Sequence, residues 1–408
     1  MPSSAPPKTK PVTTTRPCPV CLAHQARLLF HQTFSSFSEG GLLTGYDVVV
    51  CAECGGAYAD KIPARAVFDI YYAQMSKYEQ SQRSGELSPL EKERFSQVCD
   101  MLAPHLKPEM RIVDVGCATG GLLAELQRRG FKNLLGLDPS PACGETARRL
   151  YGIEVRTMTI NELTGLNEQF DCVVLTGVFE HLPELDESIS SLLKIMKPGG
   201  KLYVEVPDAS SYYQWFSAPY QFISIEHVNY FSPASLSNLL ARRGFNCVFT
   251  KKVTRHLGPK SVEPAIAALF SLTDQPQPIK PDPDTEPALL KYIDSSARLE
   301  QAIHLKIGRL VDSHVPLAVW GAGTHTLRLL ETSKLGKARI LAFIDSNARY
   351  QGKKLHGVAI VTPAEFHSRE ATLLISSQVN EAEIKTQIQK QLGWSNPIIC
   401  LYENAATP

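Results

Sequence analysis

The stretch RIVDVGCATGG, residues 111–121, decides the fold of the central part of this 408-residue chain. It begins with a short apolar run that is typical of a buried strand, and it ends in small residues followed by a helical pattern. Small residues let a backbone approach a ligand closely, and the first N–H groups of the helix are free to bind it. We therefore expect Asp114, Gly116, Ala118 and Gly120 to lie beside a nucleoside-bearing ligand.

Strands and helices alternate on both sides of this turn. The segments NLLGLD (133–138), FDCVVLTG (170–177) and KLYVEVPD (201–208) have the pattern of buried strands, with helical stretches between them. Strands joined by helices of this length imply parallel βαβ units. A second region of the same kind begins with PLAVWGAGTHTLRLLE (316–331). The sequence therefore predicts an α/β protein with two Rossmann-like domains, of which the second is smaller.

Changes of composition along the chain divide it into five expected segments. The N-terminal tail is rich in Pro, Ser and Thr and cannot bury a core, and the Pro/Asp-rich stretch DQPQPIKPDPDTEP is typical of a linker. We expect a disordered tail over 1–16, a metal-binding knuckle over 17–62, the first Rossmann-like core over 63–255, a linker and helical connector over 256–313, and the second Rossmann-like domain over 314–408.

Charge and hydropathy argue against several classes of protein. Lys and Arg number 42 against 41 Asp and Glu, for a net charge of +1, so no overall field attracts nucleic acid or an anionic membrane. No apolar run reaches the roughly 20 residues of a membrane helix, and the N-terminus lacks the apolar core of a secretory signal. We expect a cytoplasmic protein that has neither a membrane nor a nucleic-acid partner, and the oligomeric state stays open.

Four of the ten cysteines form the pattern CxxC…CxxC, at Cys18, Cys21, Cys51 and Cys54. In a reducing compartment such pairs bind metal more often than they form disulfides. Four thiolates complete the tetrahedral shell of a structural zinc ion, which leaves no open position for catalysis. The sequence therefore predicts structural zinc, with a redox dithiol or two unrelated pairs as the alternatives.

Two acidic residues indicate which ligand the glycine-rich turn binds. Asp138 ends the strand after the turn, where a carboxylate can accept hydrogen bonds from both ribose hydroxyls of a nucleoside. Asp114 ends the strand before the turn, where it would repel a phosphate. An acid at this place suits a cationic ligand, which favours S-adenosylmethionine, with its sulfonium and ammonium groups, over a dinucleotide. A dinucleotide-binding domain is the alternative.

Residues from about 70 to 250 resemble class I S-adenosylmethionine-dependent methyltransferases. The resemblance is carried by VDVGCATGG, LGLDPS, FDCVVLTGVFEHL and LLKIMKPGGKLYVEVP, with Ala118 where a second glycine is usual. It implies that Asp114 and Gly116 lie near the methionine part of the cofactor and that Asp138 holds the ribose. It also implies that Thr159 and Ile160 flank the adenine and that Thr176 lines the pocket.

The whole arrangement of knuckle, core and second domain resembles the sugar C-methyltransferase group. In that group a base removes a proton beside the ketone of a nucleotide-linked 4-keto sugar, and the enolate takes the methyl group. The resemblance implies that His227 is the base, with Glu226 beside it, and that His181 faces the ligand crevice. The chain departs from the family at Ser224 and Ile225, where a tyrosine and a histidine are usual.

Simpler structural roles are the alternatives for these residues. Glu226 could make only a structural hydrogen bond, and His181 could only shape the pocket. Tyr71, Tyr72 and Tyr78 lie on one helical segment, where they could close over the cofactor or merely pack.

The second domain has Thr326 where a third glycine is expected, so we expect it to be structural or to clamp the substrate, holding the nucleotide part of a sugar nucleotide. The expected acceptor is a small molecule. The alternatives are O-methylation of another metabolite, a non-catalytic binding protein, and a methyltransferase acting on RNA or protein.

Overall fold

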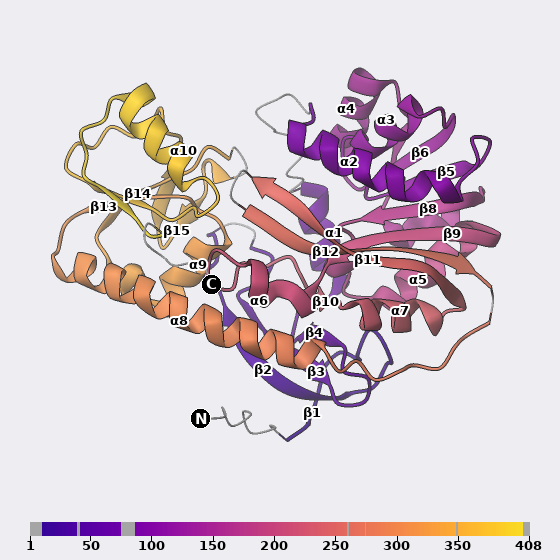
Figure 1. Ribbon diagram of the computed structural model, residues 1–408. Helices are drawn as coiled ribbons and strands as arrows, with labels where there is room; N and C mark the ends of the chain where they lie inside the picture. The colour runs from indigo at the N-terminus through magenta and orange to yellow at the C-terminus, as the bar shows by residue number, and fades with distance from the viewer. Residues whose placement is uncertain are drawn as a thin grey trace.

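Three β-sheets organise the chain (Figure 1). The computed structural model describes residues 10–38, 41–74, 86–258, 261–273, 275–347 and 350–402. Within these ranges the N-terminal sheet has five strands, the central sheet has seven, and the C-terminal sheet has six. No helix in the described ranges is both long enough and apolar enough to cross a membrane.

The N-terminal sheet is antiparallel and carries the four-cysteine segment. Its strand order is β1-β2-β3-β4-β10. The bounds are β1 Val12–Thr13, β2 Gln25–Thr33, β3 Gly45–Cys51, β4 Ala57–Asp60 and β10 Asn229–Tyr230. The valine-rich strand β3 is buried along almost its whole length, as β-branched residues suit a strand covered on both faces. Because β10 belongs to the central part of the chain and pairs with β4, the small sheet is tied directly to the core.

The central sheet has the order β11-β12-β9-β8-β5-β6-β7. Its strands are β5 Arg111–Val115, β6 Asn133–Asp138, β7 Val155–Thr157, β8 Phe170–Thr176, β9 Met196–Pro207, β11 Phe245–Gly258 and β12 Ser261–Leu272. Strands β5 to β9 are parallel, whereas β12 runs antiparallel to both β9 and β11. This is the doubly wound sheet that the alternating pattern predicts, closed at one side by an antiparallel hairpin.

Helices cover both faces of the central sheet (Figure 1). One face packs against α2 Pro89–Leu102, α3 Gly121–Arg128 and α4 Pro141–Tyr151, and the other against α5 Leu185–Ile195 and α7 Pro233–Ala241. Neighbouring residues of β5 point in opposite directions, so Ile112 packs with the first set and Val113 with the second. A Ser88 capping box begins α2, with Pro in its first turn.

The expected boundary of the core at residue 255 is wrong. The end of β11 and the whole of β12 lie beyond it, and β12 is inserted between β9 and β11. The segment AIAALF within β12 consists mainly of good helix formers. Its pairing with a strand on each side overrides that local preference, since all six residues are buried there. The connector therefore begins only after Leu272.

The long helix α8 (Thr285–Asp312) leads from the core to the C-terminal sheet (Figure 1). That sheet has the order β15-β16-β14-β13-β17-β18, and only its edge strand β15 is antiparallel among the pairs described. Its elements are β13 Leu317–Trp320, α9 Thr324–Thr332, β14 Ile340–Ile344, β15 Lys354–Leu355, β16 Val358–Val361, β17 Thr372–Ile375, α10 Glu381–Thr386 and β18 Ile398–Cys400. The second Rossmann-like domain is thus present as a smaller parallel sheet.

Arg328 on α9 fastens the C-terminal domain to the rest of the chain. Its guanidinium donates two hydrogen bonds, of 2.7 and 2.8 Å, to the carboxylate of Glu300 on α8. It also donates to the side-chain oxygen of Gln32 on β2 and lies 4.1 Å from the ring centroid of Tyr220. Because Arg328 and Glu300 are both buried, this contact fixes how the C-terminal domain faces the core.

Candidate active site

The glycine-rich turn between β5 and α3 fixes the carboxylate of Asp138. The backbone N–H of Ala118 donates to one carboxylate oxygen at 2.8 Å, and the N–H of Ser140 donates to the other at 2.9 Å. The turn needs small residues: Gly116 has φ 76°, and a Cβ added there would lie 2.6 Å from a methyl carbon of Val178. Ala118 has φ 48°, which an alanine adopts at some cost.

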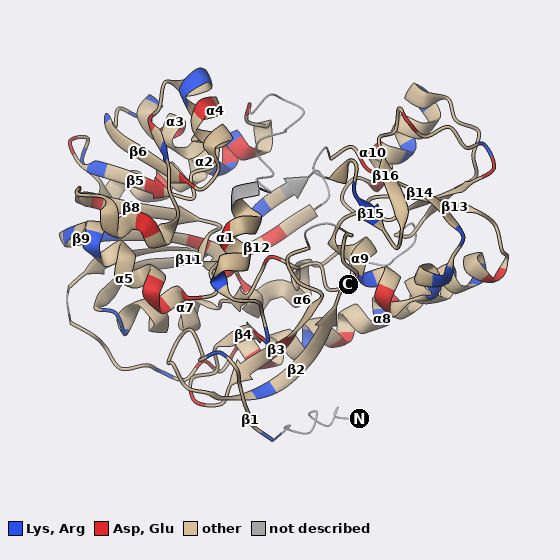
Figure 2. Cartoon of the chain, turned by 180° about the vertical axis from the view of Figure 1, so that it is seen from behind, with Lys and Arg blue, Asp and Glu red and all other residues tan. Residues whose placement is uncertain are grey.

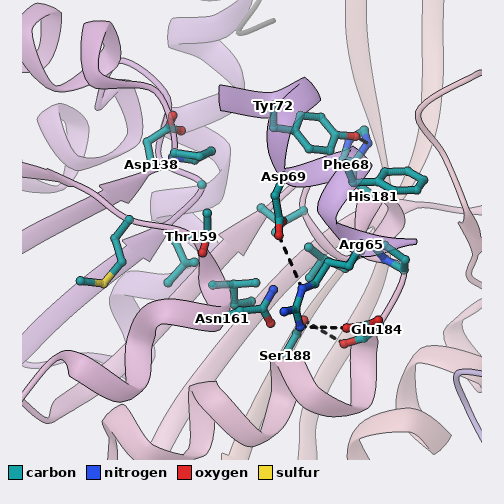
Figure 3. Close-up of a pocket in the computed structure, with 18 of the residues that line it drawn as sticks. Arg65, Phe68, Asp69, Tyr72, Asp138, Thr159, Asn161, His181, Glu184 and Ser188 are labelled. Carbon is teal, nitrogen blue, oxygen red and sulfur yellow. Dashed lines mark hydrogen bonds and ion pairs between the residues drawn. The ribbon is translucent and has the colours of Figure 1, made fainter. Parts of the chain in front are cut away.

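A cavity of about 200 Å³ opens beside this turn (Figure 3). We call it the donor cavity. Its wall is formed by α1 (Arg65–Gln74), by the turn after β5 and by the ends of β6 and β8. Six of the residues predicted to bind the cofactor line it: Tyr72, Gly116, Asp138, Thr159, Ile160 and Thr176. Asp114, Ala118 and Gly120 do not line it, and Tyr78 lies outside the described residues.

Asp114 lies behind the donor cavity rather than in its wall. Its side chain is 1% exposed, and its Oδ1 atom has no hydrogen-bond partner among the described residues. Burial raises the pKa of Asp114 to about 7, and the nearby charge of Asp138 adds to the rise, while Arg94 acts against it. The carboxyl group of Asp114 therefore gains or loses its proton near neutral pH.

The structure adds residues to the donor cavity that sequence reasoning missed. Arg65 and Asp69 of α1 point into the region shown in Figure 3, where Arg65 also pairs with Glu184 at 2.9 Å. Asn161 and Ser188 line the cavity too. The position of Asn161 next to the predicted adenine pair could have indicated it, whereas nothing in the sequence pattern around Arg65 pointed to this site.

A second, larger cavity of about 830 Å³ lies between the central and C-terminal domains. We call it the interdomain cleft. Residues of the core line one side: Arg94, Glu180, His181, Glu226, His227, Arg255 and Glu263; residues of the C-terminal domain line the other, among them Gly321, Gly323, Thr324, Asp345, Asn347, Tyr350 and Ser376. Thr176, Gly177, His181 and Glu226 line both the cleft and the donor cavity, so the two spaces meet at these four residues.

The histidines and glutamate predicted from the sequence gather at this junction. The rings of His181 and His227 lie 4.9 Å apart between centroids, at 74° to each other. The Nδ1 atom of His181 lies 3.0 Å from the hydroxyl of Tyr72 and 3.1 Å from the carbonyl oxygen of Glu226. The hydroxyl of Tyr71 donates to a carboxylate oxygen of Glu226 at 2.8 Å. The tyrosines of α1 thus contact the junction residues directly.

A buried ion-pair network lies on the core side of the interdomain cleft. Arg255 of β11 donates to Glu205 at 2.7 Å and to Glu263 at 3.3 Å, and its Nη1 lies 3.8 Å from Glu180. Burial disfavours the charged guanidinium, but these three carboxylates outweigh it and raise the pKa of Arg255. Arg94 of α2 also donates to Glu205, at 3.0 Å. Sequence reasoning missed this network because its members are far apart in the chain.

The C-terminal domain repeats the turn of the core at Gly321, which has φ 109°. Both oxygens of Asp345 accept backbone N–H groups at 2.8 Å, from Ala322 and from Asn347. Thr326, at the place of the expected third glycine, donates to the carbonyl oxygen of Gly321 at 2.6 Å. The buried hydroxyl of Thr326 therefore stabilises the turn.

The four predicted zinc ligands converge in the N-terminal sheet. The Sγ atoms of Cys18 and Cys54 lie 3.6 Å apart, those of Cys21 and Cys51 lie 3.4 Å apart, and all four lie within 4.8 Å of one another. A tetrahedral zinc ion with Zn–S bonds of about 2.3 Å places its sulfurs about 3.8 Å apart. The residues therefore fit a four-thiolate zinc site.

Comparisons with known proteins agree with the fold of the core. Residues 90–249 match the family model of the methyltransferase domain, and residues 315–399 match a model described as C2185-like, N-terminal. The chain is 32% identical to a ubiquinone biosynthesis O-methyltransferase of Rhizobium etli over 26% of its length, and 37% identical to one of Alkalilimnicola ehrlichii over 22%. The match spans 44% and 38% of those relatives, which is less than half of each.

Solved structures with likeness to the chain include the N-methyltransferase NodS from Bradyrhizobium japonicum, with a TM-score of 0.35, 19% identity, and coverage of 46% of this chain and 98% of NodS. Another is magnesium protoporphyrin IX methyltransferase from Synechocystis, with a TM-score of 0.38, 16% identity, and coverage of 51% and 97%. Residues 90–249 thus match a methyltransferase domain, and the strand order of the central sheet agrees with that fold.

Proposed function

We propose that the chain transfers a methyl group from S-adenosylmethionine to a small molecule bound in the interdomain cleft. The observation that carries this proposal is the junction at Thr176, Gly177, His181 and Glu226, which line both cavities. A methyl group that leaves a sulfonium in the donor cavity would need to cross only this junction to reach the acceptor. Holding both reactants at such a junction lowers the entropic cost of the reaction.

In the donor cavity, Asp138 accepts hydrogen bonds from the ribose hydroxyls, because its carboxylate is held at the cavity wall by two backbone N–H groups. Thr159 and Ile160 contact the adenine, and Gly116 lets the methionine part approach the turn. The ionised form of Asp114, just behind this turn, favours the cationic end of the cofactor. These roles follow the family pattern and the lining of the cavity.

The proposed reaction is C-methylation of a nucleotide-linked keto sugar. His227 takes the proton from the carbon beside the ketone, and the resulting enolate carbon attacks the methyl group of the sulfonium, so that S-adenosylhomocysteine leaves. Glu226, held by Tyr71, orients or polarises the acceptor, and His181, which lines both cavities, shapes the passage between them. The second domain, whose turn at Asp345 lines the cleft, holds the nucleotide part.

O-methylation of another small metabolite is the second candidate. The curated relatives that match the core are named as O-methyltransferases. The same histidine would then take the proton of a hydroxyl, and the oxygen would attack the methyl group. The two candidates share the donor site and differ only in the acceptor atom.

We further propose that zinc in the four-cysteine site is structural. Four thiolates leave no open coordination position, and the backbone N–H of Asp282, just before α8, donates to the carbonyl oxygen of Cys54 at 2.9 Å. The ion would hold the N-terminal sheet together and thereby support the segment that joins the core to α8. It takes no part in the transfer.

The test is formation of S-adenosylhomocysteine with a panel of nucleotide-linked 4-keto sugars and of small molecules that carry a hydroxyl group. We expect turnover with a keto sugar, and a His227→Asn variant should lose about 10²-fold or more of that turnover while it binds S-adenosylmethionine as the wild type does. His367→Asn changes an exposed histidine of the C-terminal domain and serves as the matched control. Full turnover in His227→Asn would remove His227 from the mechanism.

A second readout separates the two candidates. C-methylation predicts that the proton beside the ketone exchanges with deuterated water in the absence of S-adenosylmethionine, and that His227→Asn abolishes the exchange. Turnover with a hydroxyl-bearing small molecule and none with keto sugars would establish the O-methyltransferase instead. Absence of turnover and of cofactor binding would refute both.

A further inference from the structure

Three side chains that line the interdomain cleft form a second group with the character of a metal site. Ligand atoms of Glu180, His181 and His227 lie within 4.8 Å of one another. Glu180 lies at the cleft because it belongs to the short helical turn η3 (Phe179–His181), which begins three residues after the end of β8. Two imidazoles and one carboxylate whose ligand atoms lie this close together are a set that binds divalent transition metals.

The carboxylate of Glu180 is an independent indication of a ligand. The residue is 2% exposed and lines the cleft. Its Oε2 atom is buried with no hydrogen-bond partner among the described residues. A buried carboxylate oxygen is costly to leave unpaired, so a cation or a donor group in the cleft would relieve this cost.

We propose that Glu180, His181 and His227 bind a divalent transition-metal ion, and that the bound ion inhibits methyl transfer. The ion would occupy the lone pair with which His227 takes a proton, and it would stand in the path between the two cavities. The inhibitory part rests on the proposed function, whereas binding of the ion does not.

The surroundings of His181 suit a ligand. Metal-binding histidines are oriented by a hydrogen bond at the ring nitrogen that does not bind the metal. In His181 the Nδ1 atom lies within hydrogen-bond distance of the Tyr72 hydroxyl and of the Glu226 carbonyl oxygen. This arrangement fixes the orientation of the His181 ring.

The guanidinium of Arg255, close to Glu180, does not prevent binding of a metal ion. Arg255 lies 3.8 Å from Glu180 Oε1, but it pairs more closely with Glu205 and Glu263. Two carboxylates therefore already compensate its charge, and Glu180 adds a third. Because imidazole ligands select zinc, cobalt or nickel over magnesium or calcium, we expect Co²⁺ and Zn²⁺ to bind and Mg²⁺ not to.

The binding test uses the full chain with its cysteine site filled with zinc, titrated with Co²⁺ and followed by visible absorption. We expect one further equivalent of cobalt, without the near-ultraviolet sulfur-to-cobalt band that thiolate ligands produce. Glu180→Gln and His181→Gln should each weaken cobalt binding by at least about tenfold, as loss of a ligand or of its support does. Glu109→Gln and His367→Gln, which change exposed residues away from the junction, should bind cobalt like the wild type.

Thermal unfolding of each variant shows whether it is folded. Glu180→Gln and His181→Gln test the same site independently, because each removes a different proposed ligand. Absence of the extra equivalent in the wild type would overturn the proposal, and so would unchanged binding in both Glu180→Gln and His181→Gln. A sulfur-to-cobalt band would also overturn it, because cobalt would then be in the cysteine site.

The inhibition test adds Co²⁺ to the methyl-transfer assay. We expect inhibition that rising acceptor concentration relieves and rising S-adenosylmethionine does not. Stimulation by bound cobalt, or no effect, would overturn the inhibitory part. Cobalt binding in a chain that transfers no methyl group to any acceptor would refute the proposed function and leave the metal site standing.

Discussion

Replacing Asp114 with asparagine should make the ligand-free protein more stable at alkaline pH. In the folded chain burial and the charge of Asp138 raise the pKa of Asp114 from 3.8 to about 7. Between these two values the folded state holds a proton that the unfolded chain releases, so the free energy of unfolding falls as pH rises and becomes level above about pH 7. Asp114→Asn removes this loss, because an amide does not ionise.

The magnitude follows from the size of the pKa shift. One pKa unit corresponds to about 1.4 kcal/mol, so the stability advantage of Asp114→Asn over the wild type should grow by about 3 kcal/mol from pH 5 to pH 8. Urea unfolding at a series of pH values measures it. Asp312→Asn, which changes an exposed aspartate, should show no such trend. A difference between Asp114→Asn and wild type that stays constant over this range would show that the pKa of Asp114 is not raised by burial.

Three further predictions concern other parts of the chain. Asp138→Asn should weaken S-adenosylmethionine binding about 10- to 100-fold in a calorimetric titration, and an unchanged Kd would contradict its role at the ribose. Cys54→Ser should lose the zinc and lower the melting temperature, as chelation should in the wild type; full zinc content by elemental analysis would contradict the site. Arg328→Met should cost about 3–5 kcal/mol in urea unfolding because it leaves Glu300 buried without its partner, and adding Glu300→Met should recover most of the loss. No recovery would show that the ion pair is not the cause.

The sequence predicted those parts of the fold in which local patterns and tertiary structure agree. The strand, turn and helix at 111–128 lie where the apolar run and the glycines place them. The antiparallel strand β12 was missed because its alanine-rich segment takes its conformation from the strands on each side. A pairing of that kind depends on residues far away in the chain, and no local pattern reports it.

In the site, too, local sequence motifs predicted some residues, whereas others are placed there by tertiary packing. Residues within motifs, such as Asp138, Thr159 and Thr176, line the donor cavity. Arg65 and Glu180 were not anticipated, since their places at the cavities arise from how α1 and η3 pack against the sheet. Asp114 was expected beside the ligand, but it does not line the donor cavity and is buried near Arg94 and Asp138.

The first measurement to make on the purified 408-residue chain is a calorimetric titration with S-adenosylmethionine. We expect saturable binding of one cofactor per chain, tightened when a nucleoside diphosphate occupies the interdomain cleft. Saturable binding that no nucleotide affects would retain the donor site and move the acceptor to another class of metabolite. Absence of any binding heat from a folded chain would show that the donor cavity does not bind S-adenosylmethionine.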